Sequence, residues 1–337
     1  MSRKRIAFLS ALLAALLTLA ACQTAPGGPT DGTAAPSESA TEATPETEPA
    51  SETEPVKTGT PVKVILLSGQ SNAVGYSYNN FSRGSDFTGE RLEAARNGYP
   101  KVLIRFSNNP FEQAAEPQYG PVSNTAFEPV TFGQGSVSPY PDYLAFGPEV
   151  GIAETLTAAY PDETFYIVKC STSGASLLTR FNPADKKNPT NLYSEMVSFT
   201  EGALSDLKAE GLAPEIIAFC WIHGGADSAG NPAVYIDTYK ALLDGLKTDL
   251  AEYMPENGMS VIDAGIDTIS NTNAEALNAA KERFASGSSK RYFFPVTDLK
   301  LGANQHFTGD SMVVIGNRFG DCLKTVIETL GEPETLS

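Results

Sequence analysis

The stretch VILLSGQSN, residues 64–72, decides the fold of this chain. Its first four residues form an uninterrupted apolar run, which is typical of a strand covered on both faces in a parallel sheet. Gly69 permits a sharp turn, and Ser71 follows just past the carboxyl end of the strand, where open α/β sheets bind their ligands. A serine on such a turn exposes its hydroxyl and has backbone N–H groups close by. We therefore predict that Ser71 is a nucleophile.

Strands and helices alternate through the rest of the chain, which predicts a parallel sheet between two helical layers. We expect a three-layer α/β/α sandwich of the flavodoxin-like kind, with a central parallel sheet of about five strands, in one domain over residues 61–333. Residues 107–146 lack clear periodicity, and a loop of this length is usually functional. The predicted strands after the first are 101–106, 164–170, 215–222, 259–265 and 291–296, and the predicted helices are 89–97, 147–160, 192–210, 234–253, 274–284 and 310–329.

The composition excludes one class of partner. The chain has 337 residues, 41% of them hydrophobic, and a net charge of −16 without a long basic cluster. Nucleic acid is therefore not expected as a partner. The cysteines at 170, 220 and 322 are expected to be buried free thiols, with a disulfide as the less favoured alternative.

The amino-terminal residues predict export. Residues 1–21 carry three early cations and an apolar run too short for a comfortable membrane span, as in a signal peptide. Leu19–Cys22 resembles the bacterial lipobox, which makes Cys22 the lipidated residue; the alternative is an ordinary signal peptide with a chance cysteine. Residues 22–60 are acidic, lack aromatics, and predict a disordered tether. We expect a protein anchored by lipid at the bacterial cell surface, with no other membrane contact.

The two histidines, His223 and His306, are the candidate bases, because a serine nucleophile usually needs an imidazole to accept its proton. Each follows a predicted strand and lies in a polar loop that contains glycine. Both are therefore expected at the sheet edge that Ser71 occupies. The alternative for each is a structural role in the interior.

These motifs together resemble an SGNH-type esterase, specifically the sialate O-acetylesterase-like group that includes carbohydrate esterase family 6. The resemblance spans roughly residues 61–325, and its motifs occur in the family's order. The matched motifs are Gly-Gln-Ser-Asn at 69–72, Gly-Pro-Glu at 147–149, a turn around Gly174, part of a Trp-x-Gln-Gly-Glu-x-Asp segment at 221–227, and a terminal histidine at 306 followed by a helix containing Gly316.

The resemblance implies a role for individual residues. Ser71 would be the nucleophile and His306 the general base. The backbone N–H groups of Ser71 and Gly174 would donate to the oxyanion. His223 stands where the family has a third donor, a glutamine, and an imidazole can also donate a hydrogen bond.

Two positions depart from the family pattern. Ala303 stands where the family has the aspartate that precedes the histidine, and Gly225 stands where it has a glutamate. Asp227, Asp298 and Asp310 are candidates for the triad acid, with solvated loop acids as the alternative for each. A Ser–His dyad can work without an acid, although losing that aspartate costs on the order of 10⁴ in rate.

The functional expectation is a surface-anchored carbohydrate O-acetylesterase that acts on acetylated glycans. No cofactor and no metal are implied, because the sequence contains no cluster of metal ligands. Two alternatives remain open. One is a degenerate domain that binds glycans without turnover, and the other is an O-acetyltransferase that passes the acetyl group to a sugar.

Overall fold

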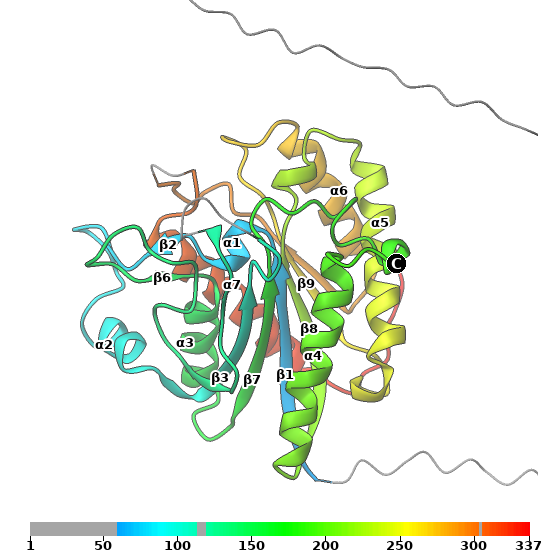
Figure 1. Cartoon of the computed structure of the whole chain (residues 1–337), viewed down its shortest axis with the longest axis horizontal. Coiled ribbons are helices and arrows are strands. Elements are labelled where there is room, and N and C mark those ends of the chain that lie inside the picture. Colours follow the sequence, from blue (N-terminus) through cyan, green and yellow to red (C-terminus); the bar gives the residue numbers. More distant parts are fainter. Residues whose placement is uncertain (1–58, 113–118, 303–304) are drawn as a thin grey trace, which may run out of the picture. The chain divides into compact units, whose positions relative to one another are not determined.

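The computed structural model, described for residues 59–112, 119–302 and 305–337, is built around one sheet of eight strands (Figure 1). The strand order is β10-β9-β8-β1-β7-β3-β4, and β5 also pairs with β3. The strands are β1 (Thr60–Gly69), β3 (Tyr99–Asn108), β4 (Val122–Ser123), β5 (Glu128–Val130), β7 (Phe165–Ser171), β8 (Leu212–Ile222), β9 (Ser260–Ala264) and β10 (Arg291–Phe294).

The expected parallel sheet is confirmed, with one strand more than the expected five. From β10 to β3 all neighbours pair in parallel. Residues 107–146, which were expected to form a loop, also contain the short strands β4 and β5, which pair antiparallel with β3. A separate two-stranded pair joins β2 (Ser77–Tyr78) to β6 (Ala145–Phe146).

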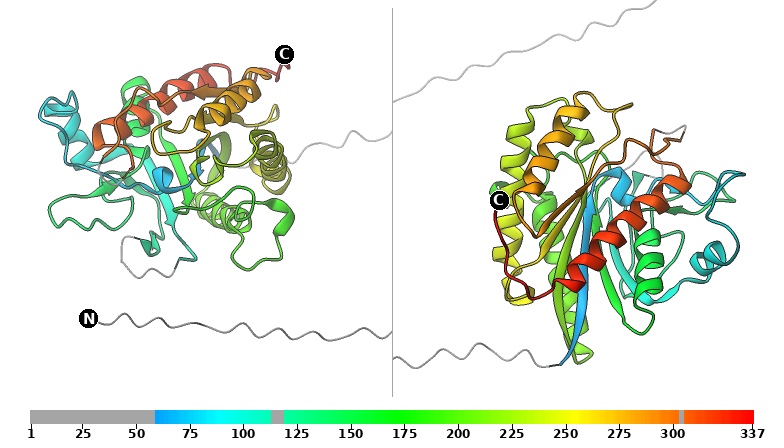
Figure 2. Two further views of the ribbon diagram at one scale, coloured as in Figure 1. Left: turned by 90° about the horizontal axis from the view of Figure 1, so that it is seen from above. Right: turned by 180° about the vertical axis from the view of Figure 1, so that it is seen from behind.

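Helices cover both faces of the sheet, which confirms the three-layer architecture (Figure 2). One face carries α3 (Glu149–Ala159) and α7 (Gly309–Glu328), whose buried side chains share a core with β3 and β10. The other face carries α4, α5 and α6 around a second core. The remaining helices are α1 (Ser71–Val74), α2 (Gly89–Asn97), α4 (Leu192–Ala209), α5 (Pro232–Asp249), α6 (Ala274–Ser286) and the short 3₁₀ helices η2 (Pro183–Asp185), η3 (Gly225–Asp227) and η4 (Ala251–Tyr253).

Two glycines let α3 and α7 pack at very short range. A Cβ on Gly316 would lie 2.6 Å from the Cα of Gly151, and a Cβ on Gly151 would lie 2.7 Å from the backbone nitrogen of Asn317. Real Cβ atoms do not approach this closely, so any larger residue would push the helices apart. The Gly316 of the terminal motif is therefore a packing residue.

The register of the central strands brings four loops to one edge. Gly69 at the end of β1 pairs with Ser171 of β7 and Ile222 of β8, and Asn108 of β3 also pairs with Ser171. Since these strands run parallel, their carboxyl ends meet there. Strand β1 lies where the order of strands reverses, the position at which α/β sheets bind ligands.

Several expectations concern residues outside the described part of the chain: the signal peptide 1–21, Cys22, nearly all of the tether 22–60, and Ala303. Within the described part, no helix has the length and apolar character needed to cross a membrane. The three described cysteines are free thiols, as expected; Cys170 and Cys220 are buried and Cys322 is partly exposed.

Candidate active site

The turn after β1 places Ser71 at the carboxyl edge of the sheet, as predicted. Gly69 has a φ of 147°, and a Cβ there would clash with the carbonyl oxygen of Ile222 on β8. The same carbonyl accepts a hydrogen bond from the Gln70 N–H at 3.3 Å. Ser71 then begins α1, and the residue is 8% exposed. The glycine is required because β8 lies directly against the turn.

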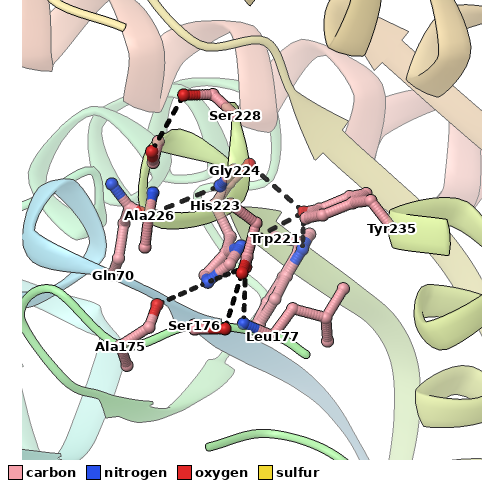
Figure 3. Close-up of polar contacts among 12 residues, drawn as sticks. Gln70, Ala175, Ser176, Leu177, Trp221, His223, Gly224, Ala226, Ser228 and Tyr235 are labelled. Carbon is pink, nitrogen blue, oxygen red and sulfur yellow. Dashed lines mark hydrogen bonds and ion pairs between the residues drawn. The ribbon is translucent and has the colours of Figure 1, made fainter. Parts of the chain in front are cut away.

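The side chain of Gln70 joins this turn to the loop that follows β8 (Figure 3). Its Oε1 accepts from the backbone N–H groups of Gly224 at 3.4 Å and Ala226 at 3.0 Å. A Cβ on Gly225 would lie 2.7 Å from Gln70 Nε2 and 2.6 Å from Asn271 Oδ1. The absence of a side chain at Gly225, where the family has glutamate, thus makes room for these two amides.

His306 packs against the segment that directly follows Ser71. Its ring is stacked on that of Tyr76, with centroids 4.8 Å apart and an interplanar angle of 18°. The next residues are joined as well, since Ser77 Oγ donates to the Phe307 carbonyl at 2.6 Å. The loop from near the carboxyl terminus therefore lies beside residues 76 and 77, which follow α1; the pairing of His306 with Ser71 stays a prediction.

Tyr76 also reaches the turn after β7, where the predicted donor Gly174 lies. Burial raises the pKa of the Tyr76 phenol, and hydrogen bonds with Ser173 and Asn109 partly offset that rise. Asn109 Oδ1 in turn accepts from the Ser173 N–H at 2.8 Å. The Thr172 N–H donates to the Gly69 carbonyl at 3.2 Å, which sets this turn against the serine turn.

Sequence reasoning missed both Tyr76 and Asn109. Asn109 is fully buried with a φ of 53°, a conformation that asparagine adopts more readily than most residues. Its place in the Asn-Asn-Pro run after a predicted strand was the available signal. Nothing in the sequence around Tyr76 marks it as a contact of His306.

His223 lies in the interior rather than at an open surface. Its ring is stacked on Trp221, with centroids 4.7 Å apart, and is 1% exposed (Figure 3). Nε2 lies 2.8 Å from the Ala175 carbonyl, and Nδ1 lies 3.2 Å from the Tyr235 hydroxyl. A carbonyl oxygen only accepts, so the N–H is on Nε2 and Nδ1 accepts from Tyr235.

This arrangement bears on the predicted donor role of His223. Burial lowers the pKa of the imidazole to about 3, against the opposing effect of the Ala175 hydrogen bond. The ring is therefore neutral at physiological pH and has one N–H, which it donates to Ala175. That N–H is therefore already engaged with a carbonyl oxygen, and the role of His223 as an oxyanion donor stays a prediction. The same hydrogen bond holds the residue next to Gly174, whose backbone N–H is a predicted donor.

The three candidate acids have structural partners. Asp227 accepts from Ser176 Oγ at 2.5 Å and from the Leu177 N–H at 2.7 Å, and burial raises its pKa. Asp298 pairs with Arg318 at 2.5 Å, which lowers its pKa. Asp310 accepts from the backbone N–H of Ser82 at 3.0 Å. The role of any of them as the acid beside His306 stays a prediction.

A buried ion pair contacts the carboxyl end of α1. Lys169 Nζ lies 3.1 Å from Glu149 Oε2, and neither side chain is exposed. The ammonium also donates to the carbonyls of Gln134 at 2.8 Å and Val74 at 3.2 Å, and Val74 is the last residue of α1. The glutamate of the Gly-Pro-Glu motif thus holds a lysine under the serine helix.

A second pair supports the loop that carries His223. Lys281 Nζ lies 2.8 Å from Asp263 Oδ1 and donates to the His223 carbonyl at 2.8 Å. Burial raises the pKa of Asp263 to about 6, against the opposing charge of Lys281.

Across residues 59–112, 119–302 and 305–337, no group of three or more His, Cys, Asp or Glu side chains is arranged to hold a metal ion.

The three-layer sandwich, with Ser71 at the carboxyl edge of its parallel sheet, has the architecture expected of the SGNH-type esterases that the sequence resembles. The model of the family described as carbohydrate esterase, sialic acid-specific acetylesterase, matches residues 61–325. Because this is well over half of the chain, the protein belongs to that family, and it is a carboxylic ester hydrolase of the class that acts on acetylated sugars.

One solved structure supports the fold. The chain is 18% identical to a protein from Arabidopsis thaliana, with a TM-score of 0.55, over 80% of this chain and 99% of that one. A carbohydrate acetylesterase from Xanthomonas citri gives 13% identity, a TM-score of 0.48, and coverage of 79% and 56%. A carbohydrate acetylesterase from Sinorhizobium meliloti gives 10% identity and a TM-score of 0.43, over 79% of this chain and 99% of that one. Comparison with curated proteins gave no match.

Proposed function

We propose that the protein removes acetyl groups from glycans by covalent catalysis at Ser71, with His306 as the general base. The observation that supports this is the stacking of His306 on Tyr76, five residues after Ser71, beside the turn that carries Gly174. Nucleophile, base and oxyanion donors need to lie within one small region. The contacts of Tyr76 with His306 and Ser173 support this, because they link the His306 loop to the segment after α1 and to the turn after β7.

The proposed reaction has two halves. The Ser71 oxygen attacks the acetyl carbonyl carbon while its proton passes to His306, and the N–H groups of Ser71 and Gly174 donate to the resulting oxyanion. The bond to the sugar oxygen then breaks, and that oxygen takes the proton from His306. A water molecule then gives a proton to His306 and attacks the carbonyl carbon of the acetyl-serine. The bond between that carbon and Ser71 Oγ breaks, Ser71 Oγ takes the proton back from His306, and the acetyl group leaves as acetic acid, which ionises to acetate.

The experiment compares wild type with Ser71→Ala on 4-nitrophenyl acetate and on O-acetylated glycans, with acetate release as the measurement. Ser205→Ala, an exposed serine on α4, is the matched control and is expected to keep full activity. We expect Ser71→Ala to lose activity by at least roughly 10³-fold. Equal rates for wild type and Ser71→Ala would refute the proposal.

We further propose that the protein is exported and attached by lipid at Cys22. The basis is the short apolar run followed by Leu-Ala-Ala-Cys at residues 19–22. Expression in a bacterial host with labelled fatty acid tests this. The wild type is expected to take up label and fractionate with membranes, and Cys22→Ser to do neither; label on Cys22→Ser would contradict the assignment.

A further inference from the structure

Exposed apolar side chains gather on the long segment between β3 and α3. Tyr140, Tyr143 and Leu144 are 50%, 40% and 51% exposed, and Tyr119 is 48% exposed. Apolar groups held in water in such a cluster are unfavourable unless they meet a partner, so a cluster of this kind marks a binding surface. We call Tyr78, Tyr140, Tyr143 and Leu144 the tyrosine surface.

The rings of the tyrosine surface are held in place before any ligand arrives. Tyr140 packs edge-on against Tyr78, with centroids 5.2 Å apart at 90°, and lies 6.2 Å from Tyr143. The Tyr140 N–H donates to Ser138 Oγ at 3.1 Å, and the Tyr143 N–H donates to the Tyr140 carbonyl at 3.3 Å. A surface fixed in this way loses little entropy on binding.

The tyrosine surface continues from the candidate active site. Tyr78 comes two residues after Tyr76, which stacks on His306, and it pairs with Ala145 in the β2–β6 ladder. The Asn79 and Leu144 backbones are also joined, by a hydrogen bond of 3.1 Å. Figure 1 shows β2 and β6 beside α1 at the same end of the sheet.

The chemistry of these side chains fits sugar rings. The C–H face of a pyranose is apolar and flat enough to lie on a tyrosine ring, while the phenol hydroxyl serves the polar rim of the sugar. A net charge of −16 disfavours a polyanion in the same place. Tyr140 contacts both Tyr78 and Tyr143, so the three rings offer a continuous surface that suits several sugar units of a chain better than one small molecule.

We propose that the tyrosine surface binds sugar units of a glycan chain beyond the acetylated unit, so that the preferred substrate is an oligosaccharide or polysaccharide. This inference rests on the proposed function. In this proposal Tyr140 and Tyr143 set the preference for longer substrates, and neither residue takes part in the reaction itself.

The experiment measures kcat and KM for two length series: acetylated xylose against acetylated xylotetraose, and 9-O-acetylated sialic acid against 9-O-acetylated sialyllactose. The enzymes are wild type, the double variant Tyr140→Ala/Tyr143→Ala, and Tyr140→Phe. Val234→Ala, an equally exposed apolar side chain on α5, is the control for general surface change. Hydrolysis of 4-nitrophenyl acetate reports the reacting groups separately.

We expect wild type to prefer the longer member of at least one series. The double variant should raise KM for that substrate by roughly thirtyfold, which is the equivalent of about 1 kcal/mol for each of the two rings removed. Its rate on 4-nitrophenyl acetate should be unchanged, and Val234→Ala should resemble wild type. Tyr140→Phe keeps the ring and loses only the hydroxyl, so its KM should lie between those of wild type and the double variant. An equal KM for short and long substrates in both series, or a Tyr140-dependent dimer in sedimentation, would overturn the inference, while loss of wild-type activity on every ester would instead refute the proposed function.

Discussion

The two histidines follow strands at the same edge of one sheet, yet the structure gives them opposite surroundings. His223 is enclosed by aromatic rings, and each ring nitrogen has a fixed partner, Ala175 or Tyr235. His306 lies in a loop, stacked on one face by Tyr76 beside the serine turn. In the sequence both are histidines in polar loops that contain glycine.

The difference teaches that burial, rather than position along the chain, separates a structural histidine from a candidate base. A base must accept a proton near neutral pH, and the pKa of His223 is lowered to about 3 by burial. Its fixed N–H supports the turn beside Gly174 instead. Four predictions test how far this division of labour holds.

The largest effect is expected from His306→Ala. Loss of the base should lower kcat for 4-nitrophenyl acetate by roughly 10³–10⁴-fold, because Ser71 would have no group to accept its proton. The melting temperature should change little. Steady-state kinetics and thermal unfolding measure the two quantities, and a variant with activity within tenfold of wild type would contradict the assignment.

His223→Ala should act mainly on stability. It leaves the Ala175 carbonyl and the Tyr235 hydroxyl without a partner in the interior and opens a cavity between aromatic rings. The free energy of unfolding should fall by about 3 kcal/mol. Denaturant unfolding measures it, with His223→Gln as the milder control, since its amide can still donate to Ala175. Unchanged stability in the alanine variant would show that the network is unimportant.

Much of the fold could be predicted from the sequence because its signals are local. Apolar runs of four to eight residues and helical periodicity predicted the six parallel strands and the main helices within a few residues. The short strands β2 and β6 were missed, since two residues carry no period. Their pairing depends on contacts between segments far apart in the chain.

The site was predictable in part for the same reason. Ser71 was placed correctly because a strand, a glycine and a serine are adjacent in sequence. The partners of Tyr76 and Asn109 depend on how loops from three strands meet, which no local pattern encodes. Likewise, the hydrogen bonds of His223 to Ala175 and Tyr235 join residues 48 and 12 positions apart.

The pH dependence of stability provides a third test of His223. With a pKa of about 3 when folded and about 6.5 when unfolded, the residue binds a proton in the unfolded state first as the pH falls. The free energy of unfolding should therefore decrease between pH 6.5 and pH 3. Asp263, whose folded pKa is raised to about 6, has the opposite effect between about pH 6 and pH 4.

The comparison with His223→Gln isolates the histidine, because that variant retains Asp263. Between pH 6.5 and pH 4.5, wild type should lose about 2 kcal/mol more than His223→Gln. Urea unfolding at several pH values measures the difference. Parallel curves for the two proteins would contradict this prediction, because they would mean that His223 titrates in the folded state as it does in the unfolded state.

The smallest effect is expected from Tyr76, which we regard as a positioning residue for His306. Tyr76→Leu removes the stacked ring and should lower kcat about tenfold with little change in KM, because a misoriented imidazole is a poorer base. Tyr76→Phe keeps the ring but loses the hydrogen bonds to Ser173 and Asn109, so its kcat should fall by less than that of Tyr76→Leu.

A double-mutant cycle separates positioning from general loosening of the site. If Tyr76 acts through His306, Tyr76→Leu should have almost no effect on the residual rate of the His306→Ala protein, because the group it orients is already gone. If the tenfold loss persists in that background, Tyr76 acts through the turn that carries Ser173 and Gly174 instead. In that case Tyr76 holds the loops around Ser71 much as His223 does, and His306 does not depend on the Tyr76 ring for its orientation.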